Sequence, residues 1–287
     1  MKIAFVIVLL NFSFFAYCQT KIGYILDSET NESIPYTNII GVNNELKLIS
    51  DKNGNYSADK VMNLKPNDKI VFYASGYDSK ELLVSDIVKS EYKVFLNQKS
   101  ILLEEAVISS NVQKEILGNK ELGTISSKFF SEFDPRDFDE LGKERGIVLA
   151  ITEKTKFNNL KFYVAQNEFK YVKLKLNFYS VSEEKTFELL NQQDIFIEVR
   201  DEYKGWVDVN LQEYDLVFRK QEGSTKIVAS LQWLESIKSN DESEKFGINA
   251  KRAKKRNRAY NFNSQYGLGW RFSKFDLAFY FDVTTFK

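Results

Sequence analysis

The feature that most constrains the fold is an alternation of apolar and polar side chains in the second half of the chain. Between Tyr171 and Ser180, Val172, Leu174, Leu176 and Phe178 alternate with polar residues. Successive side chains of a β-strand point to opposite faces, so this period of two predicts strands with one buried and one solvated face, typical of antiparallel sheets. Similar runs lie at 160–164, 207–211, 227–233 and 275–283. They predict a jelly-roll-like sandwich of about eight strands from Gly146 onward.

The first half also reads as strands, but its apolar runs are shorter and turn signals separate them. Ile22–Leu26, Ile34–Val42 and Asp68–Ala74 are the clearest runs. Together with the weaker ones they predict an all-β sandwich of about seven strands. Asn53-Gly54 lies between two such runs, and this pair favours a type I′ hairpin turn because both residues tolerate positive φ.

The order of short motifs in this first half resembles the carboxypeptidase regulatory-like domain, a transthyretin-like β-sandwich. The residues that carry the resemblance are Gly23, Ile34-Pro35-Tyr36, Asn38, Asp51, Gly54-Asn55-Tyr56, Asp68, Ile70, Phe72 and Gly76-Tyr77. Leu103–Ile108 resembles the segment that follows this domain in bacterial outer-membrane receptors. The strand pattern of the second half is similar to that of secreted bacterial proteins that begin with such a domain. In that family the domain is an accessory module without catalysis, so the resemblance implies no active site.

The amino-terminal residues predict export. Lys2 precedes the apolar run Ile3–Phe15, and Ala16-Tyr17-Cys18 ends it, which is the pattern of a Sec signal peptide. Cleavage after Cys18 is favoured over a lipoprotein anchored at Cys18, because Tyr17 is large where a lipoprotein signal needs a small residue. The address would be the periplasm, the outer membrane or the cell surface. No later run reaches the length of a membrane-spanning helix, so an integral helical membrane protein is not expected.

The predicted organisation follows from these patterns. Residues 1–18 are a signal peptide, 19–108 a regulatory-like β-sandwich, 109–127 a polar linker and 128–287 a jelly-roll-like β-sandwich. The fold class is all-β, as two tandem sandwiches.

Composition excludes several kinds of chemistry. The chain has no histidine, so Ser-His-Asp triads, Cys-His proteases and histidine-based zinc or iron sites are excluded. The net charge is zero, which gives no reason to expect nucleic acid as a partner. We predict no catalytic residue, no metal site and no cofactor. A glycosidase that uses two carboxylates stays open, because 40 acidic residues would provide such a pair by chance.

Four residues are candidates for ligand binding. Trp206 shares a polar strand face with Asp208, and Tyr171 and Tyr179 share another with lysines. An aromatic ring beside acids and amides can stack on a sugar while the polar groups bind its hydroxyls. The alternative is that Trp206 packs beneath a loop, since tryptophan is mostly buried. The leading interpretation is a non-catalytic exported binding or structural module. The alternative is a protein that binds or processes glycans through the second sandwich. The expected partner is a surface glycan or an outer-membrane protein.

Overall fold

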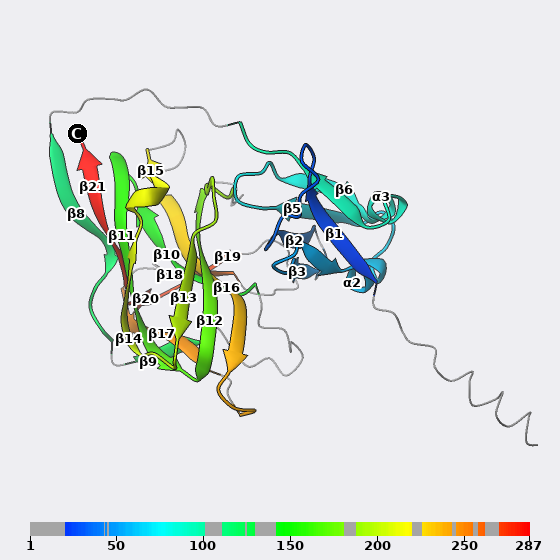
Figure 1. Cartoon of the computed structure of the whole chain (residues 1–287). Helices are drawn as coiled ribbons and strands as arrows, with labels where there is room; N and C mark the ends of the chain where they lie inside the picture. Colours follow the sequence, from blue (N-terminus) through cyan, green and yellow to red (C-terminus); the bar gives the residue numbers. More distant parts are fainter. Residues whose placement is uncertain are drawn as a thin grey trace, which may run out of the picture.

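The fold is known from a computed structural model, which describes residues 21–42, 44, 46–100, 111–123, 125–129, 142–180, 188–219, 226–242, 245–254, 258–261 and 270–287. The predicted signal peptide, Cys18 and Leu103–Ile108 lie outside the described residues. The two tandem β-sandwiches of the prediction are confirmed: β1–β7 form the first sandwich and β8–β21 the second (Figure 1).

The first sandwich has seven strands in two sheets, of order β4-β1-β7 and β3-β2-β5-β6. Its core is aliphatic with a few rings, including the fully buried Ile25, Ile39 and Phe72. Two short helices, α2 (Ala58–Met62) and α3 (Val84–Lys89), contribute Val61 and Ile87 to the same core. The strands are β1 (Ile22–Asp27), β2 (Asn38–Val42), β3 (Lys47–Ile49), β4 (Asn55–Ser57), β5 (Lys69–Tyr73), β6 (Lys80–Leu83) and β7 (Lys93–Leu96).

The turn at Asn53-Gly54 is not the expected type I′ hairpin. Only Gly54 has a positive φ, of 74°. The flanking strands pair in different sheets, β3 with β2 and β4 with β1. The carboxylate of Asp51 accepts hydrogen bonds from the backbone N–H groups of Asn53 and Asn55. The turn therefore carries the chain from one sheet to the other, which the local sequence cannot distinguish from a hairpin.

The second sandwich packs a six-stranded sheet, β13-β12-β16-β10-β18-β19, against an eight-stranded one. In the latter, β20-β17-β11-β21-β8 is the main path, β14 and β15 pair with β11, and β9 pairs with β17. The apolar positions of the alternating runs fill the space between, with Phe157, Phe178 and Phe281 in mutual edge or tilted contact. The strands of the six-stranded sheet are β10 (Glu144–Ala150), β12 (Phe169–Ser180), β13 (Phe196–Arg200), β16 (Lys226–Lys238), β18 (Arg258–Asn261) and β19 (Trp270–Ser273). Those of the eight-stranded sheet are β8 (Val112–Asn119), β9 (Ile125–Phe129), β11 (Lys154–Asn167), β14 (Gly205–Asn210), β15 (Val217–Phe218), β17 (Phe246–Arg252), β20 (Phe275–Leu277) and β21 (Phe279–Phe286).

The segment predicted as a linker, 109–127, is wrong in one respect, because it holds β8 and the start of β9. Strand β8 pairs antiparallel with the carboxy-terminal β21 along its whole length, from Val112↔Phe286 to Asn119↔Phe279. Nearly every residue of β8 is exposed. A strand that buries so little shows no apolar alternation, so only its distant partner defines it.

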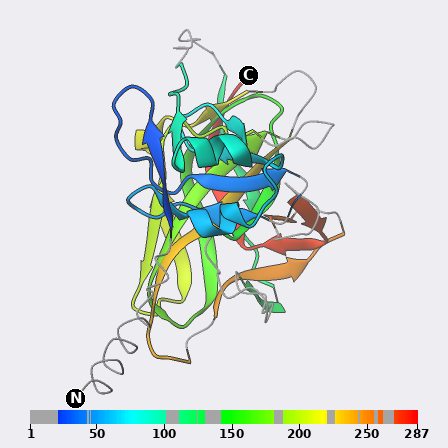
Figure 2. The same cartoon turned by 90° about the vertical axis from the view of Figure 1, so that its right-hand side faces the viewer.

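The outward face of the six-stranded sheet is not solvated as expected. The first sandwich lies against it, on the side opposite the eight-stranded sheet (Figures 1 and 2). Lys175, Asn177 and Tyr179 of β12 are 0%, 0% and 2% exposed. The alternation was interpreted correctly for the inner face, but polar side chains on the outer face are enclosed between the two sandwiches.

Polar contacts join the two sandwiches at this face. Gln232 of β16 donates to the side-chain oxygen of Asn38 at 2.6 Å and accepts from Asn177 at 3.1 Å. Tyr36 donates to Glu235 and accepts from the ammonium of Lys173, which also lies over its ring. Tyr36 and Asn38 belong to the Ile-Pro-Tyr motif region of the first sandwich, so this motif serves as the attachment to the second.

Candidate binding face

The candidate site is the outward face of β8, β21, β11 and β14 in the eight-stranded sheet, which we call the binding face. It is the surface of the second sandwich remote from the first (Figure 1). Strand pairing sets its members: Trp206 of β14 lies opposite Tyr163 of β11, and Asp208 lies opposite Lys161. Lys161 in turn lies opposite Tyr280 of β21. Three strands thus bring aromatic and charged side chains into adjacent rows.

An aromatic cluster occupies one end of the binding face. The ring of Trp206 contacts Tyr163 and Tyr280 edge-on, with centroids 5.4 and 5.5 Å apart. All three side chains are half-buried. Edge-to-face packing fixes the orientation of the Trp206 ring while leaving part of it accessible. The predicted alternative, full burial beneath a loop, is not what the structure shows.

Lys161 connects this cluster to two carboxylates. Its ammonium lies 3.1 Å from Asp208 and 3.9 Å from Asp282. The hydrogen bond and charge of Asp208 raise the pKa of Lys161, with a further contribution from Asp282. The lysine is therefore a cation at neutral pH and holds two carboxylates with their free oxygens at the surface. The row offers hydrogen-bond donors and acceptors side by side.

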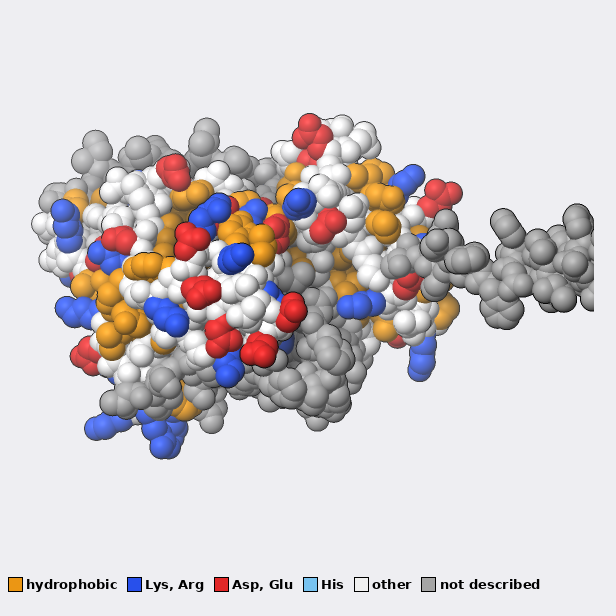
Figure 3. Space-filling model, turned by 60° about the horizontal axis from the view of Figure 1, so that its bottom comes forward, with side chains coloured by type: hydrophobic (Ala, Val, Ile, Leu, Met, Phe, Trp, Pro, Cys, Tyr) orange, Lys and Arg blue, Asp and Glu red, His pale blue; other side chains and the backbone are white. Residues whose placement is uncertain are grey.

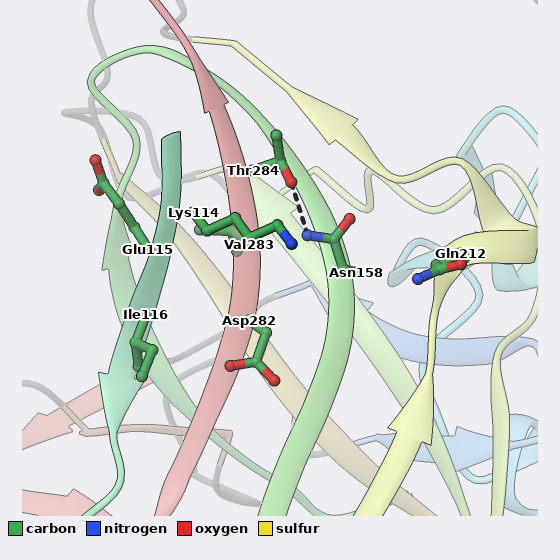
Figure 4. Close-up of a pocket in the computed structure, with 8 residues that line it drawn as sticks. All are labelled: Lys114, Glu115, Ile116, Asn158, Gln212, Asp282, Val283 and Thr284. Carbon is green, nitrogen blue, oxygen red and sulfur yellow. Dashed lines mark hydrogen bonds between the residues drawn. The ribbon is translucent and has the colours of Figure 1, made fainter. Parts of the chain in front are cut away.

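A shallow pocket of about 620 Å³ continues the binding face beyond Asp282. Its floor is Asn158, whose amide donates to Thr284 at 2.9 Å, and Figure 4 shows Lys114 reaching across β21 toward that amide. Gln212 stands on the other side of Asn158, next to β14. The complete lining is Lys114, Glu115, Ile116, Asn158, Gln212, Asp282, Val283 and Thr284. Amides, a hydroxyl and one apolar side chain make this a polar site without a buried charge.

The four predicted site residues do not lie together. Trp206 and Asp208 are on the binding face, with Asp208 exposed. Tyr171 is on the six-stranded sheet, where its hydroxyl donates to Glu198 at 3.0 Å and Arg200 lies over its ring. Tyr179 is a correction: its ring is enclosed at the junction of the sandwiches and its hydroxyl donates to Glu144 at 2.9 Å. Period-two phase places a side chain on a face but does not say what covers that face.

Sequence reasoning missed Tyr163, Tyr280 and Asn158 as members of this face. Tyr163 and Tyr280 each occupy the polar phase of an alternating strand, which is the same signal that selected Trp206. Asn158 gave no signal, because a register shift between Phe157 and Asn159 of β11 sets its position. Only strand pairing shows that these residues are neighbours.

The junction of the sandwiches holds a second polar cluster, centred on Glu144. This carboxylate is 0% exposed and accepts hydrogen bonds from Tyr179 and, at 2.7 Å, from Ser230. Burial raises its pKa, which the nearby charges of Lys47 and Lys175 partly oppose. Burial also raises the pKa of Tyr179, and the charge of Glu144 adds to it. A ligand has no route to these enclosed groups, so the cluster is structural.

Within the described ranges, no three His, Cys, Asp or Glu side chains gather as a metal site would require. None of the helices in the described part of the chain has the length and apolar character needed to cross a bilayer. Both signs of charge are interspersed over the surface seen in Figure 3. That face therefore carries no extended patch of one sign.

Comparison with known proteins gives no family. No protein-family model and no curated protein matches the chain. Among solved structures, it is similar to the cysteine protease and lectin-like domains of Cwp84, a surface-layer-associated protein of Clostridium difficile, at 10% identity and a TM-score of 0.36 over 88% of this chain. The chain spans 59% of the length of that structure. Cwp84 after propeptide cleavage gives 11%, 0.36, 93% of this chain and 71% of that one. A structure of infectious bursal disease virus gives 9%, 0.24, 92% and 64%. These TM-scores are too low to support an argument about function.

Proposed function

We propose that the protein is a non-catalytic binding module that recognises glycan through the binding face. The observation that carries the proposal is the half-exposed ring of Trp206, held edge-on by Tyr163 and Tyr280 beside the row of Lys161, Asp208 and Asp282. The apolar face of a sugar ring would stack on the aromatic cluster. Its hydroxyls would bind the neighbouring carboxylates and amides, which accept and donate hydrogen bonds.

The architecture supports this proposal. The first sandwich covers the six-stranded sheet, which leaves the eight-stranded sheet as the open broad face of the second sandwich (Figure 2). An accessory role agrees with the resemblance of the first sandwich to regulatory-like domains. We further propose export through the Sec pathway with cleavage after Cys18. Mass spectrometry of the protein from its native host would then find Gln19 as the first residue, whereas an acylated Cys18 would show a lipoprotein.

A glycan array tests the binding proposal, with residues 19–287 compared with the variant Trp206→Ala. Stacking on one aromatic ring contributes on the order of 1–1.5 kcal/mol, so its loss should weaken binding about tenfold. Tyr171→Ala is the matched control, because it removes a partly exposed ring from the six-stranded sheet and should leave binding unchanged. Absence of any glycan signal from the folded wild-type protein would refute the proposal and favour a protein-facing scaffold.

A further inference from the structure

This inference rests on the proposed function and specifies its ligand. We propose that the binding face recognises an uncharged oligosaccharide several rings long, lying along β21 from the aromatic cluster at Trp206 to the pocket at Asn158. A single sugar would fill only one end of this face. An acidic glycan would meet carboxylates along its path.

The length follows from the spacing of the two ends. Tyr280 marks the aromatic cluster and Thr284 the pocket, and both lie on the outward side of β21. Four residues of a strand at about 3.4 Å each separate them by about 13 Å, which accommodates about three pyranose rings. Asp282 lies between the two ends and belongs to both, through Lys161 and through the pocket lining. The polar floor is therefore continuous.

The charge on the floor favours a neutral ligand. Lys161 is already paired with Asp208 and Asp282, and Lys156, which lies opposite Thr284, is paired with Asp215 at 2.6 Å. An anionic group placed over Asp282 would face a carboxylate whose counter-ion is shared with a second carboxylate. A hydroxyl can donate to the same oxygens without bringing a charge that must be desolvated.

The pocket end supplies groups suited to hydroxyls. Asn158 uses one N–H on Thr284, and its carbonyl oxygen remains available as an acceptor in the described structure. The exposed amide of Gln212 faces the pocket from the β14 side, and its side chain can both donate and accept. These two amides should therefore bind the ring farthest from Trp206.

Calorimetry with sugar ladders tests the inference. The probes are gluco-, xylo- and manno-oligosaccharides from one ring to six, with oligogalacturonates as the acidic ladder. We expect affinity for one neutral ladder to rise with each ring up to the third and then to level off. Trp206→Ala should weaken every length about tenfold. Gln212→Ala should weaken the trisaccharide and longer ligands severalfold and leave the disaccharide unchanged. Gln193→Ala, an exposed amide before β13, is the matched control and should change nothing.

The outcomes separate this inference from the function beneath it. If a single sugar binds as tightly as the longer chains, or if the acidic ladder binds more tightly than every neutral one, the inference is refuted while glycan binding stands. The same holds if Gln212→Ala weakens the disaccharide as much as the trisaccharide. If no ladder binds and the array is also blank, both proposals fail.

Discussion

The buried pair of Lys175 and Asp194 allows a quantitative test of how the two sandwiches are joined. The Lys175 side chain is 0% exposed, and its ammonium lies 2.5 Å from the Asp194 carboxylate, whose side chain is 22% exposed. Lys175 lies opposite Gln232 on the sheet face that the first sandwich covers. Asp194 is the one ion-pair partner recorded for Lys175 among the described residues. Its removal would leave a fully enclosed ammonium without a counter-charge.

The expected magnitudes follow from this asymmetry. Breaking a buried pair by removing one partner costs about 3–5 kcal/mol, so Asp194→Asn should lower the free energy of unfolding by that amount. Lys175→Met should cost less, because Asp194 keeps part of its hydration. The double variant Lys175→Met/Asp194→Asn should lie within about 1 kcal/mol of wild type, since neither charge remains.

Urea unfolding followed by tryptophan fluorescence measures these effects. Trp206, Trp233 and Trp270 all lie in the second sandwich, so their emission reports that unit. With a slope of about 2 kcal/mol per M, a loss of about 3 kcal/mol moves the midpoint by about 1.5 M. Equal small effects of both single variants, or additive effects in the double variant, would refute the reasoning. Either result would mean that water reaches Lys175 or that the sandwiches separate at this face.

Three further variants test other parts of the structure. Burial raises the pKa of Glu144, so this group's contribution to folding is greatest below its unfolded pKa of about 4.3 and is lost as pH rises. Glu144→Gln should therefore gain stability relative to wild type between about pH 4 and pH 8 in urea melts, and a constant difference would contradict burial of the charge. Hydrogen bonds from the backbone of Thr30, the side chain of Gln98 and others lower the pKa of Asp27, so its contribution exists above about pH 3.9 and is lost in acid. The difference between wild type and Asp27→Asn should accordingly shrink as pH falls toward 2, and a difference that grows would exclude this role. Gly146→Ala would place a Cβ 2.1 Å from the carbonyl oxygen of Ala229 in the paired strand β16, so we expect loss of the folded second sandwich by circular dichroism, and a wild-type melting temperature would show that β10 can shift.

The sequence by itself determined which side of most strands is buried. Leu174 and Phe178 of β12 and Phe281 of β21 were placed on inner faces by alternation alone, and all three are fully buried. The physical reason is local, because the pleat of a strand turns successive side chains to opposite sides whatever the strand pairs with. The same phase correctly separated Trp206 from the core positions of its strand.

Only the tertiary structure decided what covers the other side of each strand and which residues become neighbours there. Lys175 occupies a polar phase and is completely enclosed, because a sandwich whose contact residue Asn38 lies far away in the chain docks on it. Trp206 shares its surface with Tyr280 only because β14 and β21 both pair with β11. Strand β8 exists by virtue of β21, near the opposite end of the chain. Pairing and coverage depend on contacts between segments distant in sequence, and no local period records them.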